Sequence, residues 1–414
     1  MHINNSQAGV FHLKLDFDSP ECHPVDAFGV VLVLGPWIMR IRAGCYVHEG
    51  TGHFLQRGEP ALVDKWTRAK MALKAGVDLV IELPYAFCTG QAIPFAVGST
   101  FLLDAIKCSS FAFGSEAGSI QPFLNTYHLM EQHQEIYNRV IKETMQQGNS
   151  YPKALHAGFE ALKRLTEEEL IDLNQPNNIL GYHYVDAAIK QGLAIKPLTI
   201  QRIQDGYHDD VDTENTIASA TGIRKAIFEQ NDLSQVQQFV PKTTYFELEQ
   251  WQQANGRFMS WEAIWPLLQF AILRHTPEQL RCYADVSAGL ENSLLKYAHS
   301  ATFSEFMTGI KSKRYTWTRL QRTVLHIYTG ITKDLLHAHS TPSYLRILGM
   351  TENGQKYLSN VKKQLDLPLI SRVGSNNNPL LALDLHATTM YNLALQHIGI
   401  KKTDGDIKTP PIRI

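Results

Sequence analysis

From residue 64 onward, apolar and polar positions follow a regular order of helical and extended patterns. The segment 64–74 places its apolar residues on one helical face, and Gly76 follows as a helix terminator. The segment 78–83 (DLVIEL) predicts a buried strand, and a helix is expected over 97–106 and a strand over 109–113. Strands alternating with helices predict an α/β fold with a parallel sheet and helices on its faces.

The rest of the chain divides by the same patterns. Further helices and one strand are expected, in order, over 126–147, 151–165, 179–190, 196–203 (the strand) and 218–228. Long helical patterns fill 258–337, and a mixed segment follows that ends in a helix over 387–397. We therefore predict four parts: an atypical segment 1–51, an α/β domain 52–240, a mostly helical region 241–400, and a polar, loosely ordered tail 401–414.

Composition narrows the class of protein. The chain has 414 residues, 44% of them hydrophobic, and a net charge of −1, which allows a local basic face but argues against a protein that coats nucleic acid everywhere. Five scattered cysteines without a C-x-x-C pair indicate reduced thiols in the cytoplasm, with neither a zinc site nor a disulfide framework. The apolar stretch 28–39 is too short to span a membrane and predicts a buried strand near Val30 to Leu34.

Three loops carry candidate chemistry. Gln56 and Arg57 stand just before a predicted helix, Gly114 ends a predicted strand in Phe-Gly-Ser-Glu, and Asn177 and Asn178 follow a proline. In open α/β sheets, ligands bind beyond the carboxyl ends of the strands, where a guanidinium binds phosphate or carboxylate and an amide reads a ribose or purine edge. Each loop is also explained as a connection or helix cap.

The stretch 218–224 is more specific. Ser219 and Thr221 open a helix, and Arg224 lies one turn further on. Unpaired amides and the helix dipole favour phosphate at such a helix start. A capped surface helix is the alternative, but it leaves the nearby Arg202 and the Ser-x-Thr-x-x-Arg spacing unexplained.

The segment 311–322 mixes positive charge with aromatic rings. Tyr315 and Trp317 stand among five basic residues, Lys311, Lys313, Arg314, Arg319 and Arg322. Basic side chains neutralise phosphates and aromatic rings stack on unpaired bases. A solvated basic helix with its aromatic residues in the core is an equally good interpretation.

Taken together, these motifs resemble the tRNA(Met) cytidine acetate ligase family of the nucleotidyltransferase superfamily. The resemblance covers residues 52 to about 400 in order. The motifs that support the resemblance are HFLQRGEPALVDKWTRAKMALKAGVDLVIELPYAF (53–87), FGSE (113–116), PNNILGYHY (176–184), Arg202-Ile203, IASATGIR (217–224), GLEN (289–292), KSKRYTWTRLQR (311–322) and LDLHATTMYNL (383–393).

The resemblance implies a nucleotidyltransferase-like, Rossmann-like domain and a helical tRNA-binding region. ATP, with Mg²⁺, and acetate would form acetyl-adenylate without coenzyme A, and the wobble cytidine of elongator tRNA(Met) would accept the acetyl group as N4-acetylcytidine. It assigns ATP contacts to Gly114, Asn177 or Asn178, Arg202, Ile203, Ser219, Thr221 and Arg224. The segment 311–322 would contact tRNA.

One part of the family pattern is missing. Family members begin with a strand and a His-x-Gly-His loop that binds the phosphates, whereas the segment before Gly52 reads AFGVVLVLGPWIMRIRAG and holds no such motif. His48 and His53 have the wrong spacing, so no catalytic residue is assigned. Either residues 1–51 are altered, as by a frameshift, or the chain is a diverged, non-catalytic tRNA-binding member. A nucleotidyltransferase acting on a small phosphorylated substrate is a further alternative.

Overall fold

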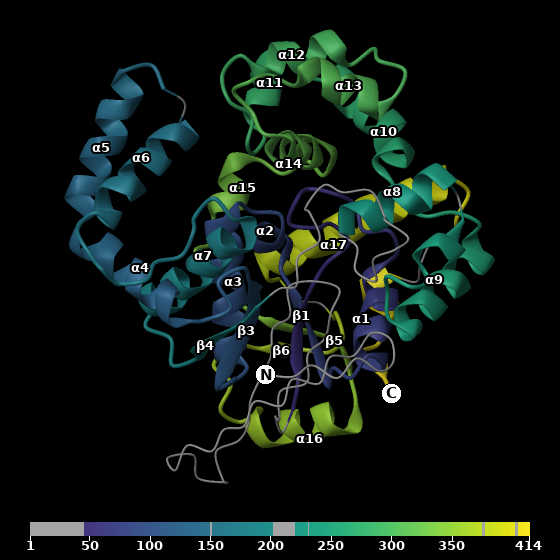
Figure 1. Cartoon of the computed structure of the whole chain (residues 1–414). Helices are drawn as coiled ribbons and strands as arrows, with labels where there is room; N and C mark the ends of the chain where they lie inside the picture. The colour runs from purple at the N-terminus through teal and green to yellow at the C-terminus, as the bar shows by residue number, and fades with distance from the viewer. Residues whose placement is uncertain (1–44, 150, 202–219, 231, 375–376, 402–404) are drawn as a thin grey trace.

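A computed structural model describes residues 45–149, 151–201, 220–230, 232–374, 377–401 and 405–414 (Figure 1). Its main sheet has the order β1-β2-β5-β6, and β7 also pairs with β5. These strands are β1 (Val47–Thr51), β2 (Leu79–Leu83), β5 (Leu345–Met350), β6 (Leu369–Ile370) and β7 (Ile412–Arg413). β1 and β2 are parallel, β2 and β5 are antiparallel, and β5 is parallel to β6 and β7. A second sheet joins β3 (Ser110–Ser115) and β4 (Lys196–Gln201) in parallel. The predicted α/β fold is confirmed, and one antiparallel pair makes its main sheet mixed.

Local sequence explains the elements nearest the main sheet. Every residue of β2 is buried, as its mostly apolar sequence LVIEL predicts for a strand covered on both faces. Helix α1 (Lys65–Lys74) begins where the Asp64 carboxylate accepts a hydrogen bond from Thr67 N, which satisfies one of the free amides of the first turn. Gly76 (φ 110°) follows the helix in a conformation that glycine adopts easily.

The next helices include α3 (Ala92–Ala105), which packs on β1 and β2, and α7 (Pro176–Lys190), which packs on β3 and β4. α2 (Tyr85–Cys88) and α3 follow β2, and α3 packs on α7. The helix predicted over 126–147 is two helices, α4 (Gln121–Gln132) and α5 (Gln134–Gln146), because the chain turns at His133. α5 pairs with α6 (Tyr151–Lys163) in a hairpin that projects at the left of Figure 1. The chain turn explains the error, since helical periodicity continues on both sides of it.

Helices build the upper right of the molecule in Figure 1, as the pattern beyond residue 240 predicts. They are α8 (Ala220–Gln230), the 3₁₀ helix η1 (Leu233–Val236), α9 (Lys242–Asn255), α10 (Trp261–Leu273), α11 (Pro277–Arg281), α12 (Leu290–Tyr297), α13 (Phe303–Ile310), α14 (Trp317–Tyr328) and α15 (Lys333–His337). Their buried apolar side chains form one core with Phe54, Val63 and Tyr85 from the α/β part. The two parts therefore share buried surface.

After α15 the chain returns to the main sheet. β5, α16 (Glu352–Val361) and β6 precede the long helix α17 (Pro379–His397), and α18 (Gly405–Lys408) and β7 follow it. β5 is buried throughout and lies between β2 and β6. The predicted helical region 241–400 thus contains a central strand of the α/β sheet, since sequence order does not reveal which strands pair.

The prediction of a loose tail is wrong for residues 405–414. β7 pairs with β5 through Gly349 with Ile412 and Met350 with Arg413, and Asp406 is buried. A two-residue strand and a four-residue helix are too short to produce a recognisable period, which is why the sequence pattern missed them.

Several predictions lie outside the described residues. They are the strand at Val30 to Leu34 and the site residues Arg202, Ile203 and Ser219. In the part of the chain that the structure describes, no helix has the length and apolar character needed to cross a membrane. Cys45, Cys88, Cys108 and Cys282 are free thiols, and the first three are buried.

Candidate functional site

The loop 52–60 connects β1 to α1 and carries the first candidate side chains. Its base is closed by the hydrogen bond from Ala61 N to His53 O (2.9 Å), and its tip by the bond from Gly58 N to Leu55 O (2.8 Å). Gly58 has φ 78°, and a Cβ there would lie 2.5 Å from Arg322 N on α14. Only glycine fits this close approach in this conformation, so the loop tip is held against the helical region.

Arg57 meets the start of α8 across this loop. Its Nη1 donates to Thr221 Oγ1 (3.4 Å), and Arg224 donates from Nη2 to Pro60 O (3.1 Å). Arg224 Nε also lies 3.8 Å from the Glu59 carboxylate. The structure thus brings the Gln-Arg-Gly loop to the helix start that the Ser-x-Thr-x-x-Arg spacing singles out.

Arg68 adds a third guanidinium at the carboxyl end of β1. It donates to Gly52 O (2.6 Å) and to Thr51 Oγ1 (2.5 Å). Burial lowers the pKa of Arg57, Arg68 and Arg224, and Arg224 contributes to lowering that of Arg68, which shows that these positive charges lie close enough to repel. Because arginine remains protonated in proteins, the end of β1 is a positive region suited to a phosphate or carboxylate.

The Phe-Gly-Ser-Glu and Pro-Asn-Asn loops meet at a second cluster. Asn178 Oδ1 accepts hydrogen bonds from Glu116 N (3.1 Å) and Ala117 N (3.2 Å), and its Nδ2 donates to Asp172 O (3.1 Å). The Glu116 carboxylate in return accepts from Asn178 N (2.8 Å) and from Asn177 Nδ2 (2.7 Å). Asn178 is buried and its amide is engaged within the protein, whereas Asn177 is half-buried. Gly114, half-buried on β3, lies opposite Ile200 of β4.

The two clusters flank β1. In Figure 1, α7 with its asparagines lies to the left of β1, and α8 with Thr221 and Arg224 lies to the right. The residues predicted to contact ATP that lie inside the described ranges therefore form two groups, one on each side of β1 in Figure 1. The carboxyl end of β1 is at the edge of an α/β sheet at which ligands bind.

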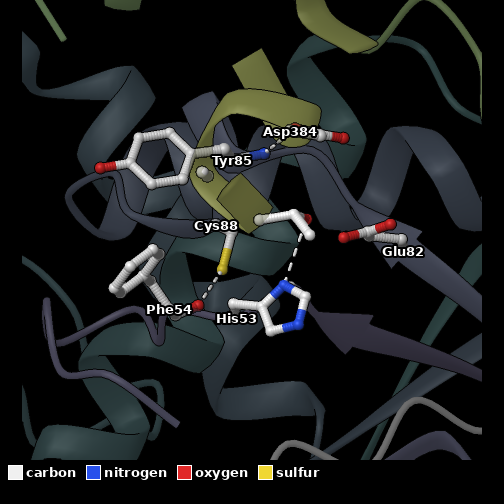
Figure 2. Close-up of a pocket in the computed structure, with 9 residues that line it drawn as sticks. His53, Phe54, Glu82, Tyr85, Cys88 and Asp384 are labelled. Atoms are coloured by element: carbon white, nitrogen blue, oxygen red, sulfur yellow. Dashed lines mark hydrogen bonds between the residues drawn. The ribbon is translucent and has the colours of Figure 1, made fainter. Parts of the chain in front are cut away.

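A small cavity lies beneath the loop 52–60 (Figure 2). Its volume is about 10 Å³, and its lining residues are Gly52, His53, Phe54, Glu82, Tyr85, Cys88, Asp384, Ala387 and Thr388. Space of this size admits about one water molecule, so no nucleotide enters it. Cys88 Sγ donates to Phe54 O (3.1 Å), and Tyr85 N donates to Asp384 Oδ1 (2.7 Å), which fixes the walls.

Buried charges surround this cavity. Lys65 Nζ lies 2.8 Å from Glu82 Oε1 and 2.6 Å from Asp406 Oδ1, and Arg346 Nη2 lies 3.6 Å from Asp406 Oδ1. Burial lowers the pKa of Lys65, but Glu82 and Asp406 outweigh this effect and raise it overall. Burial raises the pKa of Asp384 well above its usual range, and this carboxyl accepts a hydrogen bond from Tyr344 Oη.

The basic segment lies on the loop before α14 and on its first turns. Lys311, Lys313 and Arg314 are exposed, Arg319 is half-buried, and Arg322 is buried with its Nε 3.6 Å from Asp285 Oδ2. Tyr315 is buried between Arg314 and Arg319 and bonds Ser287 Oγ (2.7 Å), whereas the Trp317 side chain is 40% exposed. Tyr315 is therefore a core residue, and Trp317 is the ring that solvent or a base can reach.

Sequence inspection missed Arg68, Lys65 and Asp406. Arg68 and Lys65 lie on a helix whose pattern predicts only that it packs on the sheet. Asp406 lies in the segment that was expected to be loosely ordered. The signal available for Lys65 was a cation next to the apolar face of α1, which was too weak to assign. In the described ranges, no group of three or more His, Cys, Asp or Glu side chains is arranged to hold a metal ion.

Comparison with known proteins agrees with this geometry. The family model described as HIGH Nucleotidyl Transferase matches residues 42–406. The tRNA(Met) cytidine acetate ligase of Lysinibacillus sphaericus is 53% identical over 365 residues, which is 88% of this chain and 91% of the relative. The enzyme of the same name from Halalkalibacterium halodurans is 43% identical, over 88% of this chain and 89% of the relative. This chain belongs to the tRNA(Met) cytidine acetate ligase family.

Solved structures extend the family likeness to three dimensions. The apo crystal structure of Thermotoga maritima TmcAL has a TM-score of 0.84 and 26% identity, and covers 93% of this chain and 99% of that one. The same protein bound with alpha-thio ATP has a TM-score of 0.81 and 26% identity, over 93% and 98% of the two chains. Both the family and the nucleotidyltransferase-like fold expected from the motifs are confirmed, and the family match begins ten residues before Gly52, inside the segment predicted to be atypical.

Proposed function

We propose that this chain descends from enzymes that activate acetate with ATP and acetylate the wobble cytidine of elongator tRNA(Met), giving N4-acetylcytidine, in the cytoplasm. The observation that carries the proposal is the group of Arg57, Arg68 and Arg224 at the carboxyl end of β1, in a chain of this family. Positive charge fixed at a strand end is what a transferring phosphoryl group requires.

The reaction takes place in two steps. A carboxylate oxygen of acetate attacks the α-phosphorus of ATP, and the bond to pyrophosphate breaks. The exocyclic amine of cytidine then attacks the acetyl carbon of acetyl-adenylate, loses a proton, and AMP leaves. No coenzyme A takes part. Charge neutralisation and in-line positioning supply the rate enhancement of the first step.

We assign ATP contacts to both clusters. Thr221 and Arg224 would bind phosphate with Ser219 and Arg202, and Gly114 would let the nucleotide approach the backbone, near Ile203. One of Asn177 or Asn178 would contact ATP; the Asn178 amide bonds Glu116, Ala117 and Asp172, and the Asn177 amide bonds Glu116. Phosphate oxygens of ATP would supply most ligands of Mg²⁺, since the described residues contain no cluster of metal ligands.

We place tRNA contact on Lys311, Lys313, Arg314 and Arg319, with Trp317 as a stacking ring. Exposed basic side chains neutralise phosphates, and an exposed indole stacks on an unpaired base. Arg322 would act from beneath this surface, because it is buried against Asp285 and its backbone contacts Gly58 of the Arg57 loop.

The missing His-x-Gly-His loop lowers the activity we expect. One lost electrostatic donor typically costs about 3 kcal/mol of transition-state stabilisation. Loss of two histidines should therefore remove most of the rate enhancement of the first step. The test is acetate-dependent ATP–pyrophosphate exchange in the chain as it stands and after a His-x-Gly-His loop is restored. We expect exchange to be weak in the first and strong in the second. A restored chain without exchange would contradict the assignment.

The second candidate function is a non-catalytic tRNA-binding family member, and the absence of the His-x-Gly-His motif favours it. It requires salt-sensitive binding to tRNA(Met) that ATP and acetate leave unchanged. Filter binding at several salt concentrations, with and without both substrates, separates the two candidates.

A further inference from the structure

We propose that residues 405–414 act as a latch that positions the Arg57 loop for an anionic ligand, with Asp406 and Thr388 as positioning residues. The inference rests on the proposed ATP site and adds a role for the chain end. Its starting point is that β7 pairs with β5 of the main sheet and that Asp406 of α18 is buried, far along the sequence from the loop 52–60.

Asp406 is the centre of the latch. It is 4% exposed, and its carboxylate contacts Lys65 Nζ at 2.6 Å and accepts a hydrogen bond from Thr388 Oγ1 at 2.6 Å. Burial raises the pKa of Asp406, but Lys65 and Thr388 outweigh this effect and lower it overall, so the carboxylate is charged. A buried carboxylate with these partners is held in one place.

Thr388 connects Asp406 to the loop 52–60 through hydrogen bonds. Its only hydroxyl proton goes to Asp406, so the Thr388 hydroxyl oxygen accepts a hydrogen bond from His53 Nδ1, which lies 3.2 Å away. His53 is 3% exposed, and burial lowers its pKa, so the ring is neutral with its proton on Nδ1. The tail therefore sets the orientation of the first side chain of the loop that carries Arg57.

A second connection runs through α1. Lys65, held by Asp406 and Glu82, lies one turn before Arg68, and Arg68 donates to Gly52 O and Thr51 Oγ1 at the other side of the loop base. Both routes end on Gly52 and His53. Coupling between two sites is reciprocal, so a ligand that binds the ordered loop should also hold the tail in place.

The decisive variant is Thr388→Val, which keeps the shape of the side chain and removes both hydrogen bonds. Its matched control is Thr389→Val, since Thr389 is exposed on the same helix and its hydroxyl donates to Leu385 O within that helix. We measure the Kd for ATP by calorimetry at 25 °C and amide hydrogen exchange of residues 52–61. Thr388→Val should weaken ATP binding roughly tenfold and speed loop exchange, whereas Thr389→Val should bind within about twofold of the unmodified chain.

Thr388→Ser provides the rescue because it retains the hydroxyl. It should restore both ATP affinity and loop protection, and ATP should slow amide exchange in residues 405–414 of the unmodified chain. A Thr388→Val chain with lower Tm but unchanged loop exchange would reduce Thr388 to a packing residue and overturn the latch. Should Thr388→Val fail to fold by circular dichroism, Asp406→Asn takes its place, with the same loop exchange deciding.

Failure of the proposed function gives a different result. If the unmodified chain does not bind ATP, the ATP site is wrong for this chain, and the exchange difference between Thr388→Val and Thr389→Val still decides the latch. If ATP binds and the two variants are indistinguishable in affinity and loop exchange, the latch is wrong and the ATP site stands.

Discussion

Two neighbouring strands, β1 and β2, each bury a glutamate, and the surroundings of the two carboxyls differ completely. Glu82 on β2 is 3% exposed, contacts Lys65, and lies opposite Arg346 in the strand register. Glu49 on β1 is also 3% exposed, but neither of its carboxyl oxygens has a hydrogen-bond partner among the described residues. The nearby Ser99 hydroxyl instead donates to Phe95 O (2.7 Å).

The different surroundings also act differently on the pKa values of the two carboxyls. Burial raises the pKa of Glu49 to about 8, with a small opposing effect of Ser99, so the carboxyl is mostly neutral at pH 7. Burial also raises the pKa of Glu82, and Asp406 adds to this rise, whereas Lys65 and Arg346 offset only part of it.

Removing the partner of Glu82 should have the largest effect on this comparison. Lys65→Met leaves Glu82 and Asp406 buried with only the more distant Arg346 as a cation, and should lower the free energy of unfolding by about 3–5 kcal/mol. Urea denaturation at pH 7 measures it. The control is Lys70→Met on the same helix, whose ammonium is partly exposed and shares Glu247 with Lys74. Equal losses in the two variants would contradict the special role of Lys65.

Removing the charge of Glu49 should stabilise the chain. An unfolded glutamate titrates near 4.5 and folded Glu49 near 8, so between these pH values only the folded state holds the proton. The free energy of unfolding therefore falls as pH rises through this window and levels off above it. Glu49→Gln should abolish this part of the slope and add on the order of 3 kcal/mol at pH 8, by denaturation at a series of pH values. An unchanged slope would place Glu49 in contact with water.

We expect the smallest loss of stability from weakening the hydrogen bonds that join α1 to the carboxyl end of β1. Arg68→Lys keeps the charge but loses the planar fork that reaches both Gly52 O and Thr51 Oγ1, and should cost about 1 kcal/mol of stability. Arg139→Lys on the exposed part of α5 is the control and should have no measurable effect. Thermal unfolding of both variants compares them. A silent Arg68→Lys would show that β1 is held by its pairing with β2 alone.

Local elements near the site were predictable, and their surroundings were not. The apolar run of β2 and the pattern of α1 predicted both elements with their approximate bounds. The meeting of Glu116 with Asn177, and of Arg57 with Thr221, joins segments far apart in sequence, so only the family motifs hinted at it. The partners of Lys65 could not be predicted, because one of them comes from the chain end.

By itself, the sequence determined the family, the α/β order of elements, the absence of a His-x-Gly-His loop, and the basic segment before α14, because each is a property of neighbouring residues. Tertiary structure alone decided that β5 enters the sheet antiparallel to β2, that Arg322 and Tyr315 are buried while Trp317 is not, and that residues 405–414 close over Lys65. Strand pairing and charge burial depend on contacts between distant segments, and local patterns carry no record of those contacts.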